Sequence, residues 1–323
     1  ILADNPTIDN SRSGEITGPL TENTTGTLFT AEDDYGTSYI YAGDVDNNWV
    51  SFAGFYWRII RINGDESIRM IYSGDSSSGP VETGEETQIG TSAFNEQRDD
   101  NAYVGYMYGT PGSGTYEETH ANINDSTIKT VLDNWYQQNL LSYSNYISTE
   151  AGFCNDRSVN ITDEVWWADD TKLGYGTNAT AYGPYGRLAI NSNYRNVQIP
   201  SLKCSQARDY FTISGSSKGN HVLTYPVGLI TSDEVILAGG FGGVNGSSSA
   251  HYLNTGQYYW TVSPSHYNVK GNTAGVYYVS SIGLLNGGWV YNLWGVRPVI
   301  NLDKNVTISS GNGTIDSPYV VGA

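Results

Sequence analysis

Short apolar segments separated by polar turns dominate the chain between residues 38 and 74. The segments are SYIYAGDV, WVSFAGFYWRIIRI and SIRMIYSG, and they are rich in the β-branched and aromatic residues that favour strands. The turns between them are Asp46-Asn47-Asn48 and Asn63-Gly64-Asp65, and Asn-Gly between apolar runs is a strong local signal for a hairpin. The pattern predicts an antiparallel meander.

Residues 258–302 repeat this organisation with many more aromatic side chains. The sequence is YYWTVSPSHYNVKGNTAGVYYVSSIGLLNGGWVYNLWGVRPVINL, in which short aromatic strands alternate with turns of Gly, Asn and Ser. Successive side chains on a strand point to opposite faces, so about half of these rings must point away from the core. This segment therefore predicts a sheet that presents aromatic side chains to its surroundings.

Two segments have the apolar spacing and the end signals of helices. The first follows the cap residues 124–126, and the second begins at residues 231–234, where Thr and Glu have the spacing of a capping box before VILAGG. We expect a longer helix and a helix of about two turns. In the first segment, the apolar residues recur with a period near 3.6 residues, at Ile128, Val131, Leu132, Trp135, Leu140 and Tyr143.

The remaining segments predict one large domain with additions at both ends. Residues 1–27 are polar and have no helical period, so we expect an extended arm that packs on its own domain or adds a strand to a neighbour. Residues 28–302 form the main domain, with loop insertions at 73–119 and 154–220. Residues 303–323 form a strand or hairpin tail. The length is sufficient for a substantial core.

The charge balance restricts the choice of partners. The chain has 16 Lys and Arg against 33 Asp and Glu, a net charge of -17, so it repels phosphate backbones and anionic lipid headgroups. We expect neither nucleic acid nor a membrane surface as partner. No run of about 18 apolar residues occurs, so no membrane span is predicted in this chain. Abundant Gly, Ser, Thr, Asn and Tyr indicate an extracellular or cell-surface location.

Cys154 and Cys204 are the only two cysteines in the sequence. An even pair in an otherwise cysteine-free acidic chain predicts one disulfide in an oxidising compartment, and two unrelated buried thiols are the alternative. A bond that closes a loop of about 50 residues lowers the chain entropy of the unfolded state, which stabilises the folded protein by roughly 4 kcal/mol. A zinc site is disfavoured because neither cysteine has a Cys or His at ligand spacing.

Residues that carry enzyme chemistry show no recognisable arrangement. The chain lacks the HExxH motif of zinc hydrolases, and no nucleophile elbow of the serine-hydrolase type, a strand-to-helix turn, is expected to mark a candidate serine. A Ser/His/Asp triad is assembled only by folding, so that alternative stays open. We predict no catalytic residues, no metal and no cofactor, and a protein that is not an enzyme. The four histidines are His120, His221, His251 and His266.

Acidic residues are abundant but do not predict a site. The series Asp44-x-Asp46-x-Asn48 resembles the start of a calcium loop, but Trp49 stands where the loop requires glycine, so we interpret it as a turn. In the first insertion a solvated acidic face is expected rather than a catalytic pair. That face comprises Glu82, Glu85, Glu86, Glu117 and Glu118.

Parts of the chain resemble a known family. YWTVSP, AGVYYVSS, GLLNGG and GVRPVINL resemble the C-terminal core of C-type-lectin-like domains of the formylglycine-generating-enzyme type, the subclass of the retroelement variable proteins. Residues 30–323 are similar to uncharacterised secreted proteins of Gram-positive bacteria. The resemblance implies an α+β, C-type-lectin-like domain in which two helices flank antiparallel sheets and the late strands and their loops face the ligand.

The chain departs from well-studied members of that family. The Glu-Pro-Asn, Gln-Pro-Asp and Trp-Asn-Asp motifs of calcium-dependent sugar binding are absent, so the resemblance implies no such site. The late core also lacks the reactive cysteines of formylglycine-generating enzymes, so oxidase activity is not expected.

We therefore predict a non-catalytic extracellular or cell-surface protein that binds a glycan, a peptide or a protein. Exposed Tyr and Trp supply rigid contact area, and Asn supplies adaptable hydrogen bonds. Core packing or a turn role is the alternative for each candidate, and Arg297 is expected to pair with a buried acid or carbonyl. The candidate ligand-binding residues are Tyr259, His266, Tyr267, Asn268, Asn272, Trp289, Tyr291, Asn292 and Trp294.

A second hypothesis belongs to another class of protein. The arm formed by residues 1–27 would complete the sheet of another copy, and the protein would be a structural subunit of an extracellular filament. Head-to-tail contacts of this kind do not close, so they generate fibres rather than dimers.

Overall fold

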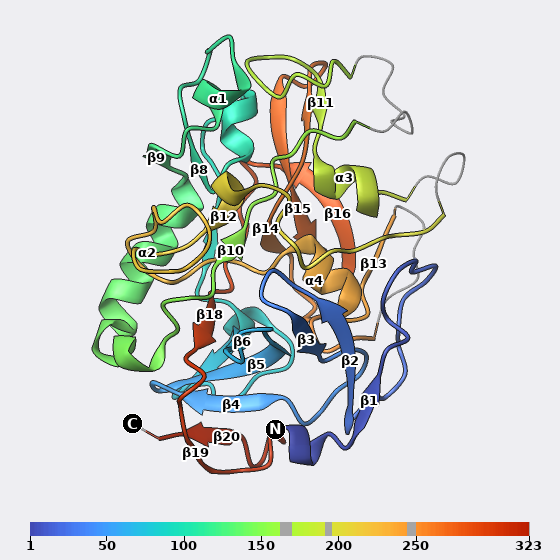
Figure 1. Cartoon of the computed structure of the whole chain (residues 1–323), viewed down its shortest axis with the longest axis vertical. Coiled ribbons are helices and arrows are strands. Elements are labelled where there is room, and N and C mark those ends of the chain that lie inside the picture. Colours follow the sequence, from blue (N-terminus) through green and yellow to red (C-terminus); the bar gives the residue numbers. More distant parts are fainter. Residues whose placement is uncertain (162–169, 191–195, 244–249, 323) are drawn as a thin grey trace.

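The computed structural model describes residues 1–161, 170–190, 196–243 and 250–322 (Figure 1). Over these residues the chain is of mixed α and β type, with much sheet and few helices, as the predicted α+β class requires. Parts of the second predicted insertion, including Trp166-Trp167, lie outside the described residues.

In the described part of the chain, the first sheet has nine strands and combines the N-terminal region with the C-terminal end. Its order is β1-β2-β3-β5-β4-β20-β19, and β6 joins the other side of β5 and pairs with β18. The strands are β1 (Thr7–Asp9), β2 (Thr27–Glu32), β3 (Thr37–Ile40), β4 (Trp49–Phe52), β5 (Phe55–Ile62), β6 (Ile68–Asp75), β18 (Val299–Leu302), β19 (Ile308–Ser310) and β20 (Tyr319–Val321).

The predicted meander is present but differs in two respects. The segment 49–62 is not one strand, because Ala53 and Gly54 both have positive φ and form a two-residue turn between β4 and β5. The strand β3 pairs with β5 rather than with β4. The Asn63-Gly64-Asp65 turn connects β5 to β6 as predicted, with Ile62 opposite Ile68.

The second sheet, seven-stranded over the described residues, lies above the first in Figure 1. At its centre β14, β15 and β16 run antiparallel, in the segment where the aromatic pattern predicts strands. Register shifts flank Pro264 in β14, since proline has no N–H for the ladder. The strands are β7 (Thr91–Ser92), β11 (Thr180–Ala181), β13 (Phe241–Gly242), β14 (Tyr259–Asn268), β15 (Thr273–Val279), β16 (Leu284–Trp289) and β17 (Trp294–Gly295).

Both predicted helices form. Helix α2 (Thr127–Asn139) is capped by the Ser126 side chain, and α4 (Ser232–Leu237) begins with the predicted Thr231–Glu234 capping box. Two short helices were not predicted, because they have too few residues to show a period: α1 (Tyr116–Thr119) and α3 (Gly183–Leu188). Two small sheets pair β8 (Met107–Tyr108) with β9 (Asn124–Asp125) and β10 (Phe153–Cys154) with β12 (Tyr210–Phe211). Among the described helices, none is long and apolar enough to cross a membrane.

Aromatic packing attaches α2 to the first sheet. The Trp135 ring on α2 lies 6.2 Å from Trp57 of β5 and 6.0 Å from Tyr72 of β6, measured between ring centroids. Edge-to-face and tilted contacts of this kind are the favoured arrangements for buried rings. Trp57 is fully buried, so the apolar stripe predicted for this helix is its core-facing side.

The N-terminal arm packs on its own chain. Strand β1 pairs in parallel with β2, with Thr7 opposite Thr27. Further along the arm, the buried Arg12 donates hydrogen bonds to the last carbonyls of α4. The Tyr319 hydroxyl of β20 donates to the Asp4 carboxylate at 2.7 Å, so the first and last segments of the chain meet at one end of the molecule (Figure 1).

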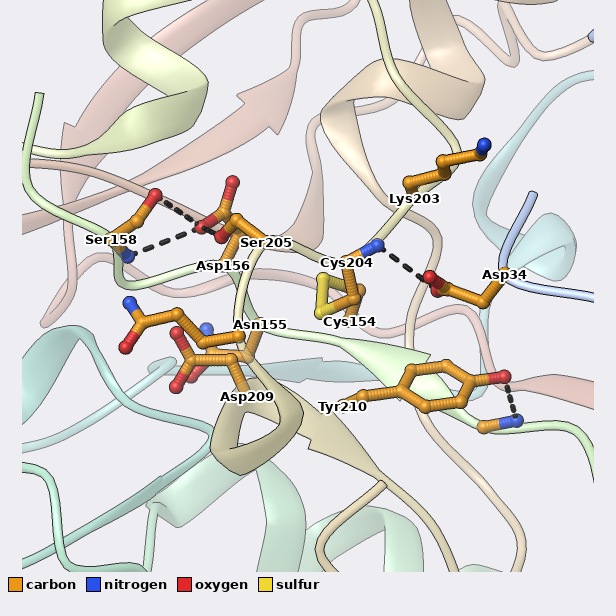
Figure 2. The surroundings of a disulfide bond; sticks show 12 residues. Asp34, Cys154, Asn155, Asp156, Ser158, Lys203, Cys204, Ser205, Asp209 and Tyr210 are labelled. Carbon is orange, nitrogen blue, oxygen red and sulfur yellow. Dashed lines mark hydrogen bonds between the residues drawn. A yellow bond between two sulfur atoms is a disulfide. The ribbon is translucent and has the colours of Figure 1, made fainter. Parts of the chain in front are cut away.

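The predicted disulfide joins Cys154 on β10 to Cys204 (Figure 2). The Cys204 amide donates to the Asp34 carboxylate at 3.0 Å, so the bond also fixes the loop after β2. On the other side, the Ser158 and Ser205 hydroxyls both donate to Asp156. The disulfide therefore closes the second insertion on itself, and the Cys204–Asp34 hydrogen bond attaches it to the loop after β2.

Candidate functional site

Three of the nine predicted ligand-binding residues are buried. The Tyr259 hydroxyl donates to the Leu253 carbonyl at 2.8 Å, and the Tyr267 hydroxyl donates to Asn272 at 2.7 Å. His266 packs against Tyr185 of α3, and burial lowers its pKa to about 4, so its ring is neutral at physiological pH. Tyr259 and Tyr267 belong to the packing of the second sheet, whereas His266 lines a cavity of about 200 Å³ between α3 and β16.

The predicted asparagines stabilise turns. Asn268 accepts a hydrogen bond from the Gly271 amide at 3.2 Å, and Asn272 adopts a positive φ of 45° in the turn between β14 and β15. Asparagine tolerates this left-handed conformation better than most residues. Asn292 lies in the turn after β16, where its backbone N–H donates to the Trp289 carbonyl at 3.0 Å.

Trp289 and Tyr291 form a stack at the end of β16. Their ring centroids are 5.8 Å apart at an interplanar angle of 25°, and the guanidinium of Arg98 lies 4.5 Å from the Tyr291 ring. Trp289 is 45% exposed. The stack is a small exposed feature, and the rings that pack with Trp294 are different ones.

Trp294 belongs to a separate cluster, which we call the aromatic platform: Tyr258, Tyr278, Leu293 and Trp294. The Trp294 ring centroid lies 3.9 Å from that of Tyr278 and 6.0 Å from that of Tyr258, and the buried Trp260 supports it at 4.4 Å. Tyr258 and Leu293 are 44% and 70% exposed. A contiguous apolar surface of this kind marks an interaction site more often than scattered single residues do.

Glycine makes the platform possible. A Cβ on Gly288 of β16 would lie 2.2 Å from the Trp294 ring, so a side chain at this position would push the tryptophan off the sheet. The neighbouring Gly287 leaves the same room for Ser265 on the opposite face. The Asn-Gly-Gly-Trp sequence thus permits a ring to lie flat on β16.

The platform borders a trough of about 540 Å³. This volume falls within the range of about 300 to 1,000 Å³ that is usual for ligand sites. Its other wall is the segment from Glu85 to Thr91, which is held to β17 by backbone hydrogen bonds between Ile89 and Val296 at 2.9 Å. The site is therefore bounded by the side chains of the platform on one side and by hydrogen-bonded backbone on the other.

The polar groups of the trough include no described Lys, Arg or His side chain. Its one described charged residue is Glu85, which is exposed, as expected for the acidic face of the first insertion. Amide and hydroxyl groups come from Gln88, Thr91 and Gln257. The trough thus combines aromatic faces with neutral hydrogen-bonding groups and one carboxylate.

Sequence reasoning found Trp294 but missed Tyr258, Tyr278 and the wall at residues 85–91. Tyr258 precedes Tyr259, and period-2 alternation separates the exposed ring from the buried one without indicating which is which. The Gly287-Gly288 pair is a signal that could have indicated a ring packed on β16. The wall segment gave no signal, because its pairing through β7 and β17 joins residues far apart in the sequence.

A second candidate is a buried network of charges beside the disulfide. Arg61 contacts Asp33 at 2.7 Å and Glu234 at 3.0 Å. Arg69 contacts the same Glu234 carboxylate at 2.5 Å. Burial raises the pKa of Glu234, but the attraction of Arg69 and Arg61 outweighs burial and holds that pKa below its ordinary value. The Glu234 carboxylate is therefore ionised, and the positive charges of Arg61 and Arg69 balance its negative charge.

Arg187 of α3 extends the network. It contacts Asp156 at 2.6 Å and Asp233 of α4 at 2.7 Å. The cavity among these groups has a volume of about 30 Å³, which is room for about two water molecules. The acids are satisfied by the arginines, so the network fastens α3 and α4 to the first sheet and leaves no space for a substrate.

Arg297 has the structural role expected of it. Its guanidinium donates to the carbonyls of Tyr72, at 3.2 and 3.0 Å, and Thr87, at 3.1 Å, and lies 4.9 Å from the buried Tyr259 ring. Among the described residues, no group of three or more His, Cys, Asp and Glu side chains is arranged to hold a metal ion.

No protein-family model, curated protein or solved structure matches this chain. The resemblance to C-type-lectin-like domains therefore depends on the sequence motifs alone and stays a prediction.

Proposed function

We propose that this protein is a non-catalytic extracellular or cell-surface protein that binds its ligand in the trough beside the aromatic platform. The observation that carries this proposal is the stacked pair of the 44% exposed Tyr258 and the partly buried Trp294, which borders a trough of ligand size. Rings fixed in this way contribute contact area at low entropic cost, because they have few rotatable bonds to immobilise.

The finer fold and the location are part of the same proposal. A C-type-lectin-like arrangement is supported by the antiparallel β14–β16 core and by α2 and α4 at the predicted places in the chain. The Cys154–Cys204 disulfide supports an oxidising location such as the cell exterior.

The test uses fluorescently labelled full-length protein with bacterial cells and with extracellular matrix from cultured animal cells as targets. We expect saturable binding to at least one target, weakened about tenfold or more by the Tyr258→Ala, Leu293→Ala double substitution. The Ile123→Ala, Leu141→Ala double substitution is the matched control, because it removes two apolar side chains of similar exposure, 67% and 49%, outside the trough. Binding that survives the double substitution unchanged would contradict the proposal.

A further inference from the structure

The rings of the platform pack on one another at moderate tilts. Tyr258 is inclined by 23° to Trp294 and by 33° to Tyr278, and Tyr278 is inclined by 41° to Trp294. Tyr258 and Leu293 remain widely exposed, so the site is an open shelf rather than an enclosed pocket. A trough with aromatic rings on one side and a wall of hydrogen-bonded backbone on the other fits an extended ligand that has an apolar face.

The hydrogen-bonding groups beside the shelf are of both kinds. The amide of Gln257 and the hydroxyl of Thr91 belong to residue types that donate and accept, and Glu85 accepts, whereas the Gln88 amide oxygen is buried. Sugar hydroxyls likewise donate and accept, and a pyranose ring carries them around an apolar face of C–H groups. The combination of shelf and rim thus matches the two surfaces of a sugar ring.

The charge of the site decides against acidic sugars. The described lining contains a carboxylate and no cation, and the whole chain has a net charge of -17. A uronate, sulfate or phosphate group would find no Arg or Lys partner there and would lie within a Debye length, about 8 Å at physiological salt, of Glu85.

The wall of the trough is also prepared for binding. Backbone hydrogen bonds join Ile89 to Val296 in one direction and Val296 to Gly90 in the other, both at 2.9 Å. The Cβ of any side chain at Gly295 would meet the Gln88 amide oxygen, so glycine there allows Gln88 to lie against β17. A wall that is already ordered loses little conformational entropy on binding.

We infer that the ligand of the trough is a neutral carbohydrate chain, whose sugar rings stack on Tyr258 and Trp294 while their hydroxyls bond to the rim. The inference rests on the proposed function and adds the chemistry of the ligand to it.

The test is affinity electrophoresis of the full-length protein through gels that contain a single soluble polysaccharide. The neutral probes are dextran, yeast mannan and hydroxyethyl cellulose, and the acidic probe is polygalacturonate. We expect at least one neutral polysaccharide to retard the wild type, with an apparent dissociation constant raised about tenfold by Tyr258→Ala and unchanged by Leu141→Ala, a control at an exposed apolar side chain outside the trough. Retardation by polygalacturonate alone, or by none of the four, would overturn the inference.

The targets of the binding assay separate this inference from the proposed function. Periodate cleaves the vicinal diols of sugars, and protease removes proteins, so each treatment is applied to the target before the labelled protein is added. Loss of binding after periodate but not after protease supports a carbohydrate ligand. Binding that depends on Tyr258 but is lost only after protease overturns the carbohydrate ligand and leaves the proposed function standing.

A correctly folded variant is needed for each comparison. Tyr258 is substantially exposed, so its truncation removes little core packing. Trp294→Ala would leave a void above Gly288 and is not suitable as the principal variant. Thermal unfolding of Tyr258→Ala within about 2 °C of the wild type establishes that lost retardation reflects the site.

Discussion

The Arg12 guanidinium donates a 2.7 Å hydrogen bond to the carbonyl oxygen of Leu237, 225 residues further along the chain. Leu237 is the last residue of α4, where carbonyl groups have no partner within the helix. A cation at this end also complements the helix dipole. The arm thus supplies a C-terminal cap to a helix of the main domain.

Replacing Arg12 should therefore destabilise the whole domain. We expect Arg12→Ala to lower the free energy of unfolding by about 2 to 3 kcal/mol, because buried charge-assisted hydrogen bonds to Ile236 and Leu237 are lost. Urea denaturation followed by tryptophan fluorescence measures the change. The exposed Ser13→Ala is the control and should change stability by less than about 0.5 kcal/mol. An equal effect of the two substitutions would show that the cap is not formed.

Removing the arm distinguishes the two classes of function. Because β1 and Arg12 contact the same chain, we expect a protein that lacks residues 1–13 to stay monomeric and to unfold at a lower temperature. Light scattering after size exclusion measures the mass, and electron microscopy detects fibres. Fibres formed by the full-length protein and lost on deletion would favour the filament hypothesis instead.

Removing the charge of Glu234 should destabilise the protein severely. We expect Glu234→Gln to cost about 3 to 5 kcal/mol, because Arg61 and Arg69 would remain buried without their shared carboxylate. The control is Glu82→Gln, since that carboxylate is 59% exposed and lies 3.8 Å from Arg58. It should change stability by less than about 1 kcal/mol. A similar small change for both substitutions would mean that the network is not neutralised as the distances indicate.

The pKa of Glu234 also fixes the sign of the acid response. Its pKa is lower in the folded protein than in the unfolded chain, so its contribution is complete at neutral pH and is lost as the pH falls below its ordinary value of 4.5. In Glu234→Gln, this part of the acid sensitivity should disappear.

Because two histidines are buried, we expect stability to fall on acidification at a higher pH than the loss caused by Glu234. Burial lowers the pKa of both His251 and His266 to about 4, from an ordinary value of 6.5. Below pH 6.5 the unfolded chain takes up protons that the folded chain does not, so stability falls between pH 6.5 and 4, by on the order of 3 kcal/mol for each ring. Urea denaturation at a series of pH values measures the slope.

Two histidine variants measure how much the buried His251 ring contributes to this slope. His251→Asn should reduce the slope between pH 6.5 and 4, because one group that titrates only in the unfolded chain is gone. His221→Asn should leave it unchanged, since His221 is exposed and asparagine accepts its positive φ of 59°. Equal slopes in the wild type and His251→Asn would contradict the prediction.

The disulfide should contribute strongly to stability. It closes a loop across 50 residues, so we expect the Cys154→Ala, Cys204→Ala double substitution to lower the free energy of unfolding by about 4 kcal/mol. Denaturation with and without reducing agent checks the same quantity in the wild type. The double variant should not respond to the reducing agent, and a response there would point to an effect unrelated to this bond.

Local patterns predicted local structure well. The Asn63-Gly64 turn, the apolar period before Leu140 and the Thr231–Glu234 spacing each depend on residues that are close in sequence, and each element formed. The pairing of β3 with β5 and of β6 with β18 depends on distant segments, for which a single sequence gives no signal.

The candidate site shows the same limit. Alternation along the late strands predicted that one face of each strand is exposed, but β14 is buried at nine of its ten positions and so on both faces. Tyr259 and Tyr267 were therefore assigned to the surface although they are buried. Trp294 was found because it stands in a turn-rich segment, whereas its partner wall at residues 85–91 comes from an insertion with no apolar period.

The hydrogen bond between Asp4 and Tyr319 has a mechanical consequence. Tension applied to the two ends of the chain acts directly across this contact, at one pole of the molecule, and loads β1 and the β19–β20 hairpin first. The strands that carry the aromatic platform belong to the other sheet, so we expect them to open later than the first. Stretching between the ends in an optical trap should record a low-force step before the main rupture.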